Sequence, residues 1–225
     1  TLDFTKKDEN GRTFLHYLMN NSHASGLLVA MLPIIRKVVK MGGNLSDVDF
    51  IGRTPLMNSV TYVEPNFVSM GCFVFLLSLD PTVDITQKDN LGETLLHGVM
   101  NNTGLYMVPN LMMYIIRKIV EMGGHLGEVD HHPRRRSPLL IFVHNLRLHH
   151  KVHMEFLLEV LSLQTATTTR LNLTKPQPSE FDEESLLQTI IGKLPVDITD
   201  IDMKILVVGI IRKIVIDMGG DLSEV

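Results

Sequence analysis

Histidines are the side chains whose spacing in this chain could support chemistry. His149 and His153 are four positions apart, so on a helix they would lie on one face and could share a zinc ion. Neither a cysteine nor a carboxylate stands at a spacing that would complete the ligands of a zinc site. We therefore interpret the pair as part of a solvated helix start, and we predict no metal site and no cofactor.

Enzyme motifs are the second kind of chemistry, and none rises above chance. The sequence shows no paired carboxylates, no Ser/His/Asp order and no phosphate-cradling glycine loop. Its repeated Gly-Gly steps follow helices, whereas a phosphate site needs glycines that open one. The single cysteine, Cys72, lies in an apolar stretch, where a buried, inert thiol is expected. The sequence therefore predicts no catalytic residue, and a protein that is not an enzyme.

Basic side chains gather in two patterns. A cluster at 134–136 precedes Ser137; it could contact a phosphate or an acidic peptide, or it could be a solvated loop whose serine caps a helix. Arg-Lys pairs recur at 36–37, 117–118 and 212–213. They could form a broken basic ridge, although the C-terminal halves of helices favour cations in any case. The formal net charge of −4 disfavours nucleic acid as a partner.

The elements that would position these residues repeat along the chain. An apolar helix end, a methionine, two glycines and a short acidic loop occur at 34–49 and 115–130, and a third copy with one extra residue closes the chain at 211–225. A glycine at this position stops a helix. Residues 1–21 match residues 82–102 at an offset of 81, with a weaker echo at an offset of 41. Such repetition predicts a repeat protein with a unit of roughly 40–48 residues.

Each unit is predicted to contain a turn and two helices. A Gly-x-Thr turn comes first, its hydroxyl can cap a short helix, and Pro55 or Pro138 follows where a missing N–H is harmless. We expect first helices at 14–21, 55–62, 95–102, 138–145 and 185–192. We expect second helices at 27–41, 66–79, 109–122, 150–163 and 201–217. The predicted fold is all-α, a helical-repeat solenoid of about five divergent helix pairs with extended loops. It forms one domain over 1–225, with units at 8–49, 50–88, 89–133, 134–182 and 183–225 and a long connector at 164–184.

The turns and glycine steps resemble the ankyrin repeat. The residues that carry this resemblance are Gly11, Thr13, Leu15 and His16; Gly52, Thr54, Pro55 and Leu56; and Gly92, Thr94, Leu96 and His97. The resemblance implies that His16 and His97 tie their turns to neighbouring backbone. An ankyrin unit has ~33 residues, so these units are longer, and the histidine is replaced by Met57, Leu140 and Gln188. An armadillo-like or HEAT-like stack, with a period of ~40–47 residues, is the structural alternative; the glycine turns and acidic loops favour ankyrin.

This resemblance implies a binding face made of loop tips and first helices. The residues predicted to contact a partner are Asp49, Phe50, Ile51, Asn90, Leu91, His132, Arg134 and Arg135. Phe50, Ile51 and Leu91 are apolar where a solvated loop is expected to be polar, so we expect them to anchor the partner. The alternative is that they pack against the adjacent tip.

The predicted function is that of a non-catalytic scaffold or inhibitor that binds another protein. A regulatory or substrate-recruiting module of a larger enzyme and a HEAT-like or armadillo-like adaptor are the alternatives. The longest apolar run, 205–216, contains Arg212 and Lys213 and is too short to span a bilayer, so no membrane partner is expected. A lone cysteine without a signal peptide favours the cytoplasm or the nucleus. Thr1 suggests a fragment of a longer chain, in which further repeats or a homo-oligomer are compatible with the pattern.

Overall fold

The computed structural model describes residues 3–20, 27–60, 67–80, 82–132, 135–148, 150–166, 186–194 and 200–213. All regular structure in these residues is helical, and no strand occurs among them, which confirms the predicted all-α class. The chain divides into two compact units, Thr1–His125 and Leu126–Val225. Each unit is described by itself.

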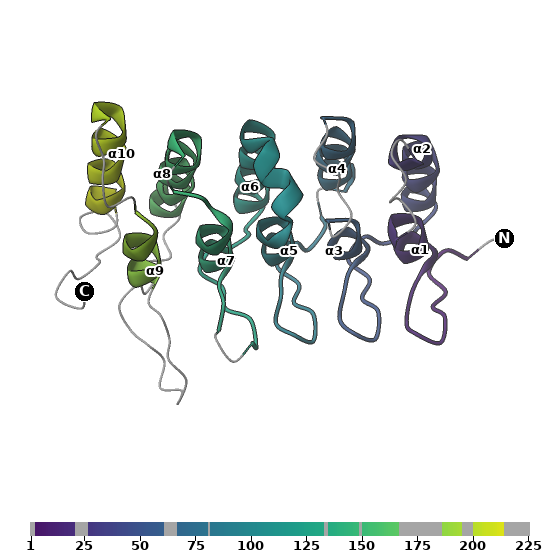
Figure 1. Cartoon of the computed structure of the whole chain (residues 1–225). Helices are drawn as coiled ribbons and strands as arrows, with labels where there is room; N and C mark the ends of the chain where they lie inside the picture. The colour runs from purple at the N-terminus through teal and green to yellow at the C-terminus, as the bar shows by residue number, and fades with distance from the viewer. Residues whose placement is uncertain are drawn as a thin grey trace. The chain divides into compact units, whose positions relative to one another are not determined.

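The first unit alternates short and long helices. They are α1 (Phe14–Asn20), α2 (Leu27–Lys40), α3 (Pro55–Val60), α4 (Phe67–Leu79), α5 (Leu95–Asn101) and α6 (Pro109–Glu121), with a 3₁₀ turn, η1 (Thr103–Met107), before α6. The short helices α1, α3 and α5 contact one another in succession, and so do the long helices α2, α4 and α6. Figure 1 shows these two rows, with the loops extending beyond the short helices.

The second unit repeats the pattern in its described part. Its helices are α7 (Pro138–Asn145), α8 (Lys151–Ala166), α9 (Leu186–Lys193) and α10 (Ile201–Arg212). Here α7 contacts α9 and α8 contacts α10. Every helix of both units begins within one residue of its predicted start, and α8 ends three residues beyond its predicted end. Most of the predicted connector and the third Met-Gly-Gly step, at 218–220, lie outside the described residues.

Buried leucines hold the row of short helices together. In the first unit, Leu15, Leu56 and Leu96 occupy equivalent positions of α1, α3 and α5 and are essentially inaccessible, and Leu139 is the equivalent buried residue of α7 in the second unit. Full burial of such a side chain stabilises the fold by roughly 1.5–3 kcal/mol. Gly98 lets α3 and α5 approach closely, because a Cβ there would lie 2.6 Å from the Cγ1 atom of Val60. The short helices of the first unit therefore form a closely packed layer beneath its loops.

The glycine steps end the long helices as predicted. Gly42 has φ 97°, and its N–H donates to the carbonyl of Val39 while the N–H of Gly43 donates to the carbonyl of Val38. This pair of hydrogen bonds is the Schellman motif, which requires a residue with left-handed backbone angles after the helix. Gly43 is required for a steric reason, because a Cβ there would lie 2.7 Å from the Cγ1 atom of Val38. Gly123, with φ 102°, ends α6 in the same way.

The segment between α5 and α6 is folded, although the sequence analysis assigned no element to it. The N–H of Gly104 donates to Oδ1 of Asn102 at 3.1 Å, which starts η1. Tyr106 is buried, and its hydroxyl donates to the carbonyl of Met100 at 2.7 Å. Pro109 then begins α6, where its missing N–H costs nothing.

Candidate protein-binding site

An aspartate shapes each loop of the first unit. Oδ1 of Asp49 accepts from the backbone N–H groups of Ile51, at 3.0 Å, and Arg53, at 2.9 Å. The N–H of Gly52, which has φ 79°, donates to the carbonyl of Asp49. Asp89 makes the equivalent bonds in the next loop. A carboxylate that accepts two backbone N–H groups fixes the turn, and Asp49 is only 8% exposed. Its polar atoms therefore face its own loop.

The loop tips are hydrogen-bonded to one another. The N–H of Phe50 donates to the carbonyl of Asn10, and the N–H of Asn90 donates to the carbonyl of Ile51, both at 2.9 Å. The Nδ2 group of Asn90 also donates to the carbonyl of Phe50 at 3.0 Å. Glycine is required where the tips touch: a Cβ on Gly52 would lie 2.9 Å from the Cα of Asp89. The three tips of this unit are thus ordered by their neighbours as well as by their own turns.

Apolar side chains project from these tips. Phe50 is 70% exposed, Ile51 55% and Leu91 59%. The Phe50 ring lies beside Gly11 of the preceding loop, where a Cβ would be 2.6 Å from its Cδ1 atom. Packing against the adjacent tip thus accounts for one edge of the ring and leaves most of it exposed. The paired tips, which we define as residues 50–51 and 90–91, present a small apolar surface on a fixed backbone.

The second unit carries a longer loop of the same kind. Oδ1 of Asp130 accepts from the N–H groups of His132 and Arg136, and the Arg136 guanidinium pairs with Oδ2 at 2.9 Å. His132 and Arg135 are exposed, and Arg135 takes a left-handed φ of 44°. The predicted contact Arg134 lies outside the described residues. Ser137 caps α7 as predicted, because its hydroxyl accepts from the N–H of Leu140 at 3.1 Å.

An exposed hydrogen bond between a tyrosine and an aspartate holds the first loop. The Tyr17 hydroxyl donates to Oδ2 of Asp8 at 2.6 Å. This bond, together with backbone N–H groups of the turn, lowers the pKa of Asp8 to about 2. The turn therefore keeps its negative acceptor at every physiological pH.

His16 is a structural residue that links two successive repeats. Its Nδ1 accepts from the N–H of Thr13 at 3.0 Å, and its Nε2 lies 3.0 Å from the carbonyl of Arg53 in the next loop. These partners require the neutral ring with the proton on Nε2. Burial lowers the pKa of His16 below its ordinary value. His97 accepts from Thr94 in the same way, so the role expected for both histidines is confirmed at their own turns.

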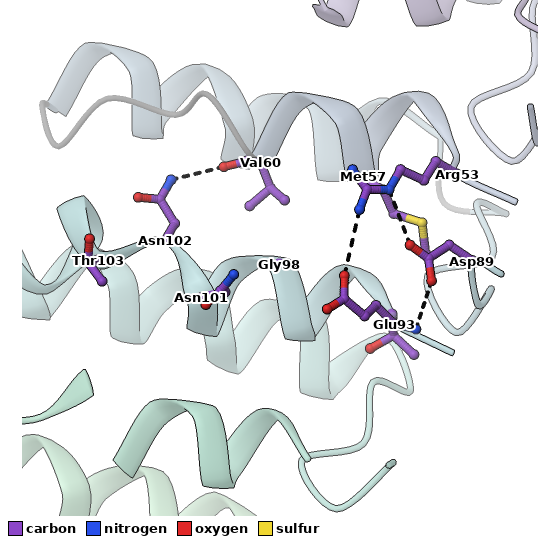
Figure 2. Close-up of a pocket in the computed structure, with 10 residues that line it drawn as sticks. Arg53, Met57, Val60, Asp89, Glu93, Gly98, Asn101, Asn102 and Thr103 are labelled. Carbon is purple, nitrogen blue, oxygen red and sulfur yellow. Dashed lines mark hydrogen bonds and ion pairs between the residues drawn. The ribbon is translucent and has the colours of Figure 1, made fainter. Parts of the chain in front are cut away.

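A polar pocket of about 340 Å³ opens between α3 and α5 at the base of the tips (Figure 2). Arg53 pairs there with Asp89 at 3.2 Å and more loosely with Glu93 at 3.7 Å. Asn102 donates to the carbonyl of Val60 at 2.9 Å. The remaining lining residues are Met57, Thr94, Gly98, Asn101 and Thr103. The pocket offers hydrogen bonds and both charges.

Sequence reasoning did not predict this pocket. The sequence feature that could have indicated it is the change from Arg53 to Glu93 at equivalent positions of successive turns. This change places opposite charges side by side. Within the described residues, no group of three or more His, Cys, Asp or Glu side chains could hold a metal ion. Arg147 donates its N–H to Nδ1 of His153 at 2.9 Å, while His149 lies outside the described residues.

Comparison with known proteins gives no family for this chain: no family model matches it, and no curated protein matches it. None of the helices in the described part of the chain is long and apolar enough to cross a membrane.

Proposed function

We propose that this chain is an ankyrin-like repeat module that binds another protein through its paired tips and the adjoining face of the first helices. The observation that carries the proposal is the exposure of Phe50, Ile51 and Leu91 on loops whose backbone is already hydrogen-bonded. Exposed apolar groups held on an ordered backbone are characteristic of binding surfaces.

The order of the tips supports this role energetically. A binding loop that must be ordered on association loses roughly 0.5–1.5 kcal/mol for each immobilised flexible side chain. In the paired tips, turn bonds and tip-to-tip bonds already hold the backbone. Burial of Phe50, Ile51 and Leu91 against a partner can therefore contribute mainly to affinity.

The polar pocket provides a neighbouring point for specificity. Asp89 and Glu93 flank Asn90 and Leu91 in sequence, so the pocket opens beside the apolar tip. Arg53 and Glu93 are only loosely paired at 3.7 Å, and both remain partly exposed. A charged side chain of the partner can therefore pair with Arg53 or with Glu93. Such contacts would form a polar rim beside the apolar centre of the interface.

The repeated turn supports an ankyrin-like architecture in preference to a HEAT-like or armadillo-like one. In the first unit the aspartate, the left-handed glycine and the threonine recur in three turns, the linking histidine occurs in two of them, and the three tips bond to one another in succession. A plain stack of helix pairs needs none of these features. Their recurrence is explained when the loops themselves have a function.

Affinity capture from lysate of the source cells tests the proposed function. The test variant carries Phe50→Ser, Ile51→Ser and Leu91→Ser. A control variant carries Met107→Ser and Tyr114→Ser, which are 78% and 53% exposed and lie on η1 and α6 of the same unit, outside the tips. Both variants must retain the helical circular dichroism of the original chain.

We expect a protein captured by the original chain and by the control variant to be lost with the tip variant. Capture of the same set of proteins by all three would refute the paired tips as the binding surface. Loss of the captured protein with both variants would indicate nonspecific binding through exposed apolar side chains and would also refute the proposal.

A further inference from the structure

The long helices carry a second surface, a basic groove between α2 and α4. The groove has a volume of about 540 Å³ and is lined by Leu32, Pro33, Arg36, Lys37, Lys40 and Phe75. Three of these residues are cations, three are apolar, and none is acidic. In Figure 1, α2 and α4 are neighbours in the row of long helices, away from the loops.

Within the described part of the chain, no carboxylate pairs with the three cations. Elsewhere in the described residues, Arg53, Arg136 and Lys151 each pair with a carboxylate. Arg36 and Lys40 are exposed, and no ion pair or hydrogen bond joins either side chain to another described residue. Three like charges on adjacent turns of one helix repel one another. The fold alone therefore does not account for the cluster.

Capping of the helix end does not account for it either. Cations near a helix C-terminus can stabilise its unpaired carbonyls. In α2, however, the carbonyls of Lys37, Val38 and Val39 already accept backbone N–H groups from 41–43. The Lys37 and Lys40 side chains are thus not needed to pair these carbonyls.

The equivalent positions of α6 carry a less positive set of side chains. At the offset of 81 residues, Arg36 and Lys37 correspond to Arg117 and Lys118, but Lys40 corresponds to Glu121. The α6 ridge therefore carries an acid one turn from its cations, where it can offset them. The α2 ridge has an additional cation in that place.

We propose that the basic groove binds an acidic peptide segment of a partner protein, with carboxylates on Arg36, Lys37 and Lys40 and an apolar side chain against Leu32, Pro33 and Phe75. Its volume falls in the range of about 300–1,000 Å³ typical of sites that enclose a small group. A flat membrane or a nucleic-acid backbone would use the charges and leave the apolar wall unfilled. The groove is separate from the paired tips, so different variants test the two proposals.

The test uses a labelled peptide in which acidic residues flank one leucine, followed by fluorescence anisotropy at low ionic strength. Two further peptides replace its leucine by serine, or its acids by the corresponding amides. The groove variant is Arg36→Glu with Lys40→Glu. The control is Arg117→Glu with Lys118→Glu, which changes the net charge equally on α6. Circular dichroism and urea unfolding verify that each variant folds.

The original chain and the control are expected to bind the acidic leucine peptide, and the groove variant to bind it about tenfold more weakly or worse. The serine and amide peptides are expected to bind more weakly than the parent, and added salt to weaken binding further. Absence of binding, equal weakening in both variants, or equal affinity for the leucine and serine peptides would overturn the proposal. So would tighter, groove-dependent binding of phosphatidylserine vesicles or single-stranded DNA, which would assign the groove to a membrane or a nucleic acid.

Discussion

Replacing Gly52 by alanine tests whether the loop tips really are in contact. The residue has φ 79°, and a left-handed conformation costs a non-glycine residue about 1–2 kcal/mol. The new Cβ would also lie 2.9 Å from the Cα of Asp89 and 3.0 Å from the backbone nitrogen of Asn90. Backbone atoms cannot rotate away, so overpacking adds about 1–3 kcal/mol. We expect Gly52→Ala to lower the free energy of unfolding by about 2–5 kcal/mol in total.

Gly42→Ala is the matched control for this change. Gly42 has a similar left-handed φ of 97°, but a Cβ there meets no atom within 4 Å. Its cost should therefore be the conformational strain alone, about 1–2 kcal/mol. Urea unfolding followed by circular dichroism gives both values. Equal destabilisation by the two substitutions would refute the close approach of the tips, whereas an excess of about 1–3 kcal/mol for Gly52→Ala supports it.

Two further changes test individual parts of the account. Because burial lowers the pKa of His16 from its ordinary value of 6.5, the folded state binds its proton more weakly than the unfolded state; the stability it contributes is complete above pH 6.5 and is lost as the pH falls towards the lowered pKa. Urea midpoints across this range should therefore fall more steeply for the original chain than for His16→Gln, and parallel curves would contradict this role. Ser137→Ala removes the hydroxyl that accepts from Leu140 and should cost about 1 kcal/mol, whereas Ser137→Asp should retain most of the cap; equal stability of the alanine variant and the original chain would contradict the cap.

Local signals in the sequence were sufficient for the helices. Pro55 and Pro138 mark helix starts, and the glycines at 42–43 and 123–124 mark helix ends, because each residue type imposes a backbone geometry that does not depend on distant contacts. The buried faces of α2 and α6 follow from apolar spacing in the same way.

Features that depend on a neighbour in space could not be predicted in this way. The hydrogen bonds between Phe50 and Asn10 and between Asn90 and Ile51 join loops about one repeat apart. The local sequence of either loop therefore does not predict them. The same holds for the polar pocket, where Arg53 meets Asp89 of the next loop. The fold of η1 depends on a tyrosine reaching back to the carbonyl of Met100. Asp49 shows the converse: its place in the loop was predicted, but its carboxylate is bonded to its own turn.

The most direct measurement of the central claim is site-specific photo-cross-linking. A benzophenone amino acid would replace Phe50 in one protein and Tyr114 in another. Both positions are aromatic and exposed, at 70% and 53%, but only the first lies on the paired tips. After irradiation with the captured partner, our account predicts a cross-linked species from position 50 and none from position 114. Cross-linking from position 114 with none from position 50 would contradict it.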